Sequence, residues 1–128
     1  LGGEVRRSER GWGIGVQQMS IAEERPWMQP PMDFCRMLFT HQDQVEVLPP
    51  GARLLGSTEH CPNAMFGVGD HILSIQAHPE YSRPYLRALI ESREAIIDPI
   101  TYKAGLSSLE MEHHRSEMAQ WLRHFLQG

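Results

Sequence analysis

The sequence predicts an α/β protein, and three features carry this prediction. Short apolar runs recur between Glu4 and Ala77 and are separated by Gly, Pro and Asp, a pattern typical of strands joined by turns. One of these runs, Ile72–Ala77, is rich in apolar and β-branched residues and ends directly before His78. Amphipathic segments with helical spacing follow from Ser82 onward.

Length, composition and charge limit what the chain can do. Its 128 residues, of which 41% are hydrophobic, suffice for the core of one domain. A net charge of -4 without a basic cluster argues against nucleic acid as a partner. No apolar run approaches the ~18 to 20 residues of a membrane span, so no membrane partner is expected. Two cysteines without a regular spacing or a secretory segment predict a reducing, cytoplasmic setting.

The first half of the chain is expected to be strands and turns. Glu4–Ser8 and Ile14–Ile21 are predicted as two strands that form a hairpin around a glycine-rich turn, and the proline-containing stretch Ala22–Asp33 as an irregular loop. Asn63–Val68 and Ile72–Ala77 are expected to pair across Gly69-Asp70 in a type II′ turn. Three further stretches precede that pair: Phe34–Phe39, Val45–Leu48 and Ala52–Ser57.

The second half is predicted to be helical. Ser82 can cap a helix over Arg83–Ile97, and Asp98-Pro99 should break it and begin a short helical piece that ends at Gly105. Ser107, with Glu110 three residues on, forms a capping box for a last helix. His113 and His114 are expected on its solvated side. Its buried stripe comprises Met118, Trp121, Leu122, Phe125 and Leu126.

His78 and Glu80 are the residues whose spacing suggests chemistry. If the extended geometry of the preceding strand persists through Pro79, both side chains point to the same side. The Glu80 carboxylate can then hold one imidazole nitrogen and leave the other basic. This arrangement activates a nucleophile in catalytic triads, and a hydrogen-bonded histidine at a strand end is the alternative interpretation.

Neither cysteine of the chain is expected to act as that nucleophile. Cys61 lies in Glu59-His60-Cys61-Pro62, with no strand-to-helix elbow and no adjacent glycine to expose or activate the thiol. His60 and Cys61 are adjacent and lack a second ligand pair, so they do not predict a zinc site. Cys35 follows Phe34 in an apolar stretch and is predicted to lie in the core.

Several segments resemble one known family. The stretch Gln76-Ala77-His78-Pro79-Glu80 resembles the Gln-x-His-Pro-Glu signature of class I glutamine amidotransferases, although they usually carry an aromatic residue at the Ala77 position. Thr40-His41-Gln42-Asp43-Gln44-Val45 resembles the family's Ser-His-x-Asp-x-Val segment, with threonine in place of serine. The turn between Leu48 and Ser57 is also similar to the family's turn between two strands.

The resemblance implies a fold, an activity and a set of site residues. The implied fold is a flavodoxin-like, doubly wound α/β sheet with additional antiparallel strands over Glu4–Val68, and no cofactor is implied. The implied activity is that of a glutaminase domain like that of GMP synthase, which hydrolyses the side-chain amide of glutamine and delivers ammonia to an acceptor. His78 and Glu80 would complete a Cys-His-Glu triad, and Thr40 and His41 would contact the substrate.

The sequence also predicts that residues 1–128 are the carboxyl-terminal portion of such a domain. The chain opens with Leu1-Gly2-Gly3, which in the family follows the Gly-x-Cys-x-Gly nucleophile turn and its helix. The expected partners are therefore the upstream half of the domain and a synthetase domain or subunit that accepts ammonia. The segment alone is expected to be inactive. A γ-glutamyl hydrolase relative and a non-catalytic binding or regulatory module that keeps the fold remain as alternatives.

Overall fold

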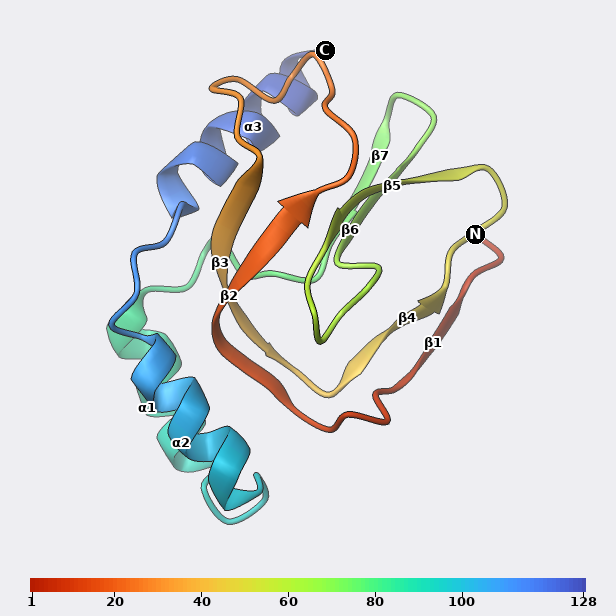
Figure 1. Ribbon diagram of the computed structural model, residues 1–128. Coiled ribbons are helices and arrows are strands. Elements are labelled where there is room, and N and C mark those ends of the chain that lie inside the picture. The colour runs from red at the N-terminus through yellow and green to blue at the C-terminus, as the bar shows by residue number, and fades with distance from the viewer.

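The structure, a computed structural model, describes all 128 residues as seven strands and three helices, which confirms the α/β class (Figure 1). Five strands form one curled sheet in the order β3-β2-β5-β6-β7, and β1 and β4 form a separate two-stranded ribbon. All strand pairs in the chain are antiparallel. The elements are β1 (Glu4–Arg7), β2 (Gly13–Ile21), β3 (Phe34–His41), β4 (Asp43–Val47), β5 (Ala52–Ser57), β6 (Met65–Val68), β7 (Ile72–Ile75), α1 (Arg83–Ser92), α2 (Pro99–Ser108) and α3 (Arg115–Gln127).

The predicted hairpin between the first two strands is wrong. β1 pairs with β4, with Val5 opposite Val45, whereas β2 pairs with β3 from Gly13 opposite His41 to Ser20 opposite Phe34. All four residues of β1 are exposed, so β1 has no apolar face to bury against β2. β2 and β3 instead share two apolar faces over eight residue pairs, and this burial decides the pairing.

The hairpin before the His78 segment is present, but its turn differs from the prediction. Val68 lies opposite Ile72, so the loop has the three residues Gly69–His71 and is not a two-residue type II′ turn. Gly69 has a φ of +59°, a conformation that glycine adopts without steric cost. β7 ends at Ile75 and is only half-buried because it is the edge strand of the sheet.

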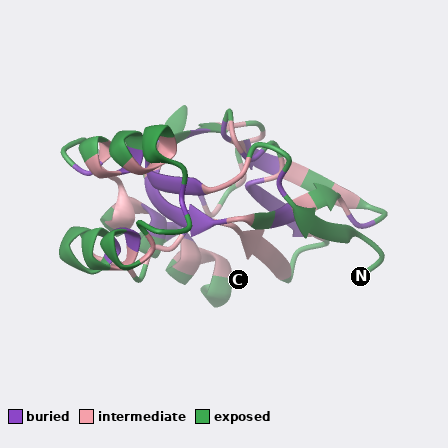
Figure 2. Cartoon of the chain, turned by 90° about the horizontal axis from the view of Figure 1, so that it is seen from below, coloured by how far each residue is buried: buried purple, intermediate pink, exposed green.

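The two faces of the β2–β3 pair belong to two separate cores. Met19, Met37 and Phe39 face the curled part of the sheet and α3, and Ile14 and Leu38 face α1 and α2. Figure 2 shows the buried positions gathered in the central strands and the exposed ones on the helices and near the amino terminus. No helix of the chain combines the length and the apolar character that crossing a membrane requires.

The first helix begins at the predicted cap but ends earlier than predicted. The Ser82 hydroxyl accepts a hydrogen bond from the Tyr85 N–H at 3.2 Å, and α1 then runs only to Ser92. Ile97 lies beyond the helix, in a turn in which its N–H bonds the Arg93 carbonyl at 3.1 Å, and there it is buried in the core between α1 and α2. The Asp98 carboxylate caps α2 as predicted and accepts the Thr101 N–H at 2.9 Å.

Gly105 does not end a helix, because α2 continues through it to Ser108. A Cβ atom at Gly105 would lie 2.5 Å from Ile14 Cδ1, so the glycine allows α2 to approach β2 closely. The Ser108 hydroxyl donates to the Gly105 carbonyl at 2.6 Å and accepts the Val16 N–H at 2.9 Å. These two bonds join the end of α2 to β2. Ser107 therefore lies within α2 and does not begin a new helix, so the predicted capping box is wrong.

The last helix starts at Arg115, and its capping residue differs from the prediction. His114 precedes α3, its Nδ1 accepts the Arg36 N–H at 2.8 Å, and its own N–H donates to the Arg36 carbonyl at 2.7 Å. His114 thus binds the edge of β3 and is not a solvated residue. Met118 and Trp121 of the predicted stripe are buried, but Leu126 is 82% exposed.

Gly105→Ala tests the close approach of α2 to β2. Alanine is intrinsically about 1 kcal/mol better than glycine within a helix, but its methyl group would overlap Ile14. We expect the variant to lower the free energy of unfolding by about 1 to 3 kcal/mol, measured by urea denaturation. Ile14→Ala is destabilising by itself, since Ile14 is buried, but the double variant should lose less than the sum of the two single losses, because the shorter side chain removes the overlap. A Gly105→Ala protein more stable than the wild type would contradict the packing described here.

Candidate functional site

The segment that carries His78 lies along the outer edge of β3. After β7 the Gln76 N–H bonds the Ala64 carbonyl at 2.8 Å, and the chain then crosses to β3, where the His78 N–H donates to the Leu38 carbonyl at 2.9 Å. The strand does not continue through Pro79 as predicted. The Tyr81 N–H bonds the His78 carbonyl at 3.2 Å, so a turn brings residues 78 and 80 to one side.

The expected contact between His78 and Glu80 is present. His78 Nδ1 lies 3.1 Å from Glu80 Oε2, and the His78 ring stacks on the Tyr81 ring at a centroid distance of 4.2 Å. An ionised carboxylate only accepts hydrogen bonds, so this contact favours a proton on Nδ1 and leaves Nε2 as a base. Partial desolvation is the largest single effect and raises the pKa of Glu80, but the hydrogen bond from His78, a backbone hydrogen bond and the charges of His78 and Arg115 together lower the pKa on balance. The pair can therefore accept a proton from a thiol.

Thr40 and His41 lie at the end of β3, but only Thr40 turns toward the helices. The Thr40 hydroxyl accepts a hydrogen bond from the Arg93 guanidinium at 2.8 Å. The His41 ring points to the other face of the sheet, with Nε2 3.2 Å from Gln44 Oε1 and its centroid 5.7 Å from that of His60. The structure thus places the His41 side chain in the interior, where its Nδ1 has no hydrogen-bond partner.

Burial keeps His41 neutral. The pKa of His41 is lowered from 6.5 to about 4, mainly by desolvation; the hydrogen bond to Gln44 opposes this shift, and the charges of His60 and His78 add to it. The residue is 7% exposed, so protonation would place a charge in the core.

Two residues near His78 were not found by sequence reasoning. Tyr81 stacks on the imidazole, and its place directly after Glu80 was the available signal. Arg93 lies just after α1, with its guanidinium carbon 5.2 Å from the centroid of the Trp12 ring. No local pattern marked Arg93, because its neighbours Trp12 and Thr40 are distant in the sequence.

Both cysteines are buried, and neither belongs to this site. Desolvation raises the pKa of Cys35 to about 12 and that of Cys61 to about 11. The Cys61 N–H is bonded to the Thr58 hydroxyl at 2.7 Å within a turn. Thiols with such pKa values are almost wholly protonated at neutral pH and are poor nucleophiles. No group of three or more His, Cys, Asp and Glu side chains is arranged to hold a metal ion.

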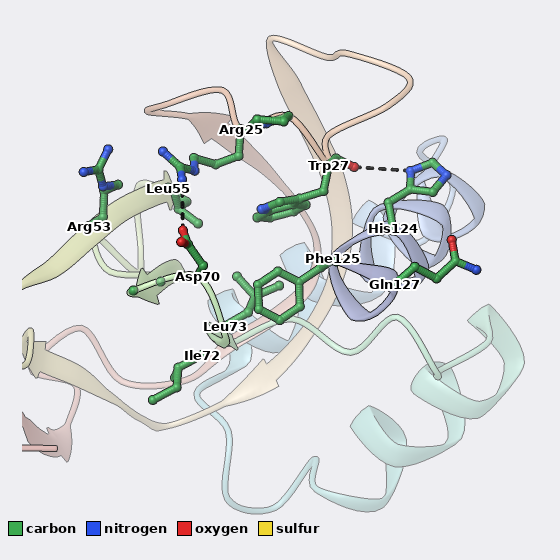
Figure 3. A pocket seen from close by; sticks show the side chains of 14 residues that line it. Arg25, Trp27, Arg53, Leu55, Asp70, Ile72, Leu73, His124, Phe125 and Gln127 are labelled. Atoms are coloured by element: carbon green, nitrogen blue, oxygen red, sulfur yellow. Dashed lines mark hydrogen bonds and ion pairs between the residues drawn. The ribbon is translucent and has the colours of Figure 1, made fainter.

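A cavity of about 640 Å³ lies away from His78, between the loop before β3, the β5–β7 part of the sheet and α3. In Figure 3 the rings of Trp27 and Phe125 lie side by side along it, with centroids 5.5 Å apart. Arg25 and Arg53 both pair with Glu23, and Arg25 also lies 3.7 Å from Asp70. These charges compensate one another, and none of the predicted site residues lines the cavity.

Acidification should destabilise the fold through His41. Between pH 6.5 and about 4 the unfolded chain binds a proton at this histidine and the folded chain does not, so stability falls as the pH is lowered. The loss should reach about 2 kcal/mol at pH 5. In urea melts from pH 7 to pH 5, His41→Gln should flatten the pH dependence, whereas the same change at the exposed His71 should leave it unaltered. An equal slope in wild type and His41→Gln would contradict the burial of a neutral ring.

Comparison with known proteins identifies relatives of two kinds. Gamma-glutamyl peptidase 3 of Arabidopsis thaliana is 33% identical over 70% of this chain and 39% of its own length. Gamma-glutamyl peptidase 2 of the same plant is 29% identical over 99% of this chain and 54% of its own length. A glutamine-hydrolyzing GMP synthase subunit of Methanoculleus marisnigri is 37% identical over 63% of this chain and 44% of its own length. The chain thus spans about half or less of the curated relatives it matches.

Solved structures share the fold. A glutamine amidotransferase from Thermotoga maritima, 23% identical, matches with a TM-score of 0.68 over 98% of this chain and 54% of that one. A glutamine amidotransferase from Methylobacillus flagellatus, 21% identical, matches with a TM-score of 0.66 over 96% of this chain and 56% of that one. No protein-family model matches the sequence. The chain therefore has the fold of glutamine amidotransferases, and its sequence relatives include γ-glutamyl peptidases and GMP synthase subunits.

Proposed function

We propose that this chain supplies the histidine and the glutamate of a Cys-His-Glu triad that cleaves the γ-amide bond of glutamine or of another γ-glutamyl compound. The observation that carries the proposal is the contact between His78 Nδ1 and Glu80 Oε2 at 3.1 Å, in a residue that the Leu38 carbonyl and the Tyr81 ring hold in place. The His78 side chain is 29% exposed, so a nucleophile and a substrate can reach its free nitrogen.

In the proposed mechanism His78 moves one proton twice. Nε2 takes the proton of a cysteine thiol, and the sulfur attacks the γ-carbonyl carbon of the substrate. The same nitrogen then returns the proton to the leaving amine as the carbon–nitrogen bond breaks, which releases ammonia when the substrate is glutamine. Water hydrolyses the thioester in a second round. The Glu80 carboxylate fixes the imidazole tautomer and stabilises the transient imidazolium.

The nucleophile in this proposal comes from outside the residues described here. Burial raises the pKa of both thiols of the chain far above neutrality, so Cys35 and Cys61 are unsuitable. We therefore infer that residues 1–128 form part of a class I amidotransferase-like domain, whose upstream half carries the reactive cysteine and is the first partner of this chain. Without it the segment should be inactive. The two free thiols agree with a reducing, cytoplasmic location.

Two fates of the substrate are compatible with the site. As a GMP synthase-like glutaminase, the protein would pass ammonia to a synthetase domain or subunit, and Thr40 and the His41 segment would contact glutamine. As a γ-glutamyl hydrolase, it would need no synthetase partner. The peptidase relatives favour the γ-glutamyl hydrolase, because one of them matches 99% of the chain, whereas the GMP synthase subunit matches only 63% of it. Ammonia release from glutamine, compared with hydrolysis of γ-glutamyl dipeptides, distinguishes the two.

His78→Asn should abolish turnover in the complete protein, with a loss of about 10²-fold or more in kcat because the general base is gone. Glu80→Gln should reduce kcat less, since it orients the base and does not itself transfer the proton. Steady-state assays of ammonia or amine release measure both effects. His71→Asn, at an exposed position of the β6–β7 loop, is the matched control and should be neutral. Full activity in His78→Asn would refute the triad assignment.

Thiol labelling tests whether the chain's own cysteines are inert. We expect Cys35 and Cys61 to react with iodoacetamide much more slowly in the folded protein than in urea, because both are buried protonated thiols. Peptide mapping by mass spectrometry locates the label. A Cys61 that reacts rapidly near neutral pH in the folded state would instead mark it as the nucleophile.

A further inference from the structure

Arg93 is a cation without an anionic partner near the His78 site. It is half-buried at the end of α1 and takes part in none of the ion pairs of the chain. Its guanidinium donates to the Thr40 hydroxyl at 2.8 Å and lies over the Trp12 ring at 5.2 Å. The hydroxyl uses one of the five N–H donors of a guanidinium. The side chain is thus fixed in position, and none of its N–H donors is paired with a carboxylate.

The structure places this guanidinium and His78 at the same end of β3. Leu38, whose carbonyl accepts the His78 N–H, and Thr40, which accepts from Arg93, are two residues apart on one strand, about 7 Å. Tyr81, which stacks on His78, is close enough for the Arg93 charge to oppose the desolvation that raises its pKa. His78 and Arg93 thus contact neighbouring residues of β3, and Tyr81 lies near both of them.

We propose that Arg93 binds the α-carboxylate of the γ-glutamyl substrate and so selects compounds in which this carboxylate is free. The inference rests on the proposed function but holds for both of its branches, because glutamine and γ-glutamyl peptides share this group. In a γ-glutamyl compound a carbon chain of about 5 Å separates the γ-carbonyl from the α-carboxylate. This length is comparable to the spacing of Leu38 and Thr40 along β3, so a substrate whose γ-carbonyl lies at His78 can direct its α-carboxylate toward Arg93.

The chemistry of the two groups fits this role. A guanidinium is planar and always charged, and it binds a carboxylate through two parallel hydrogen bonds. The contacts with Thr40 and Trp12 fix the Arg93 guanidinium before the substrate binds, so little side-chain conformational entropy is lost on binding. Arg87 on α1 differs from Arg93, since it is more exposed and pairs with Glu110 at 3.5 Å. Arg87 therefore serves as the matched control.

The test compares L-glutamine with its α-carboxamide, in which the α-carboxylate is replaced by a neutral amide. In the complete enzyme, kcat/KM for cleavage of the γ-amide should be about 10- to 100-fold higher for glutamine. Mass spectrometry of the product establishes which amide was cleaved. In Arg93→Gln the KM for glutamine should rise about 10-fold or more with a smaller change in kcat, and the preference over the α-carboxamide should largely disappear.

Two further variants separate binding from stability. Arg93→Lys keeps the charge and should recover part of the preference even if Arg93→Gln folds poorly, and Arg87→Gln should keep both the KM and the preference. A wild-type protein that turns over no γ-glutamyl compound would overturn the proposed function, and the carboxylate role of Arg93 with it. An active wild type whose preference is unchanged in folded Arg93→Gln, or that shows no preference at all, would overturn the role of Arg93 alone.

Discussion

The antiparallel pairing of β2 with β3 is the interaction on which the rest of this structure depends. It is the longest strand pair of the chain, and its two faces support separate cores, one closed by α3 and the other by α1 and α2. Alternation along β3 sends Phe39 and His41 to the first core and Leu38 and Thr40 toward the second. The outer edge of the same strand binds the backbone of His78 and of His114.

This arrangement explains how the partly exposed His78 side chain is held in one orientation. The backbone of His78 is bonded to Leu38 of β3, and its ring contacts the Tyr81 ring and the Glu80 carboxylate. Tyr81 and Glu80 both belong to the turn that follows His78. The same strand end orients Arg93 through Thr40. One strand thus positions both His78 and Arg93, the two residues to which we assign the γ-carbonyl and the α-carboxylate of the proposed substrate.

Local features of this fold could be predicted from the sequence, and long-range ones could not. The limits of β5, the caps of α1 and α2 and the contact between His78 and Glu80 depend on neighbouring residues and were predicted. The partner of β1 and the passage of α2 through Gly105 depend on packing against residues far along the chain. The same holds for Arg93, whose contacts with Trp12 and Thr40 join three separate segments, and for the inward turn of the His41 ring.

The most direct test of this account is the tautomer of His78, since the proposed chemistry needs a protonated Nδ1 held by Glu80 and a free Nε2. Two-bond ¹H–¹⁵N correlation spectra of the folded protein, recorded at a pH where the ring is neutral, report which nitrogen carries the proton. The account predicts that His78 is protonated at Nδ1 in the wild type. A His78 ring protonated at Nε2 would mean that Glu80 does not hold it and that the ring is not prepared to act as a base.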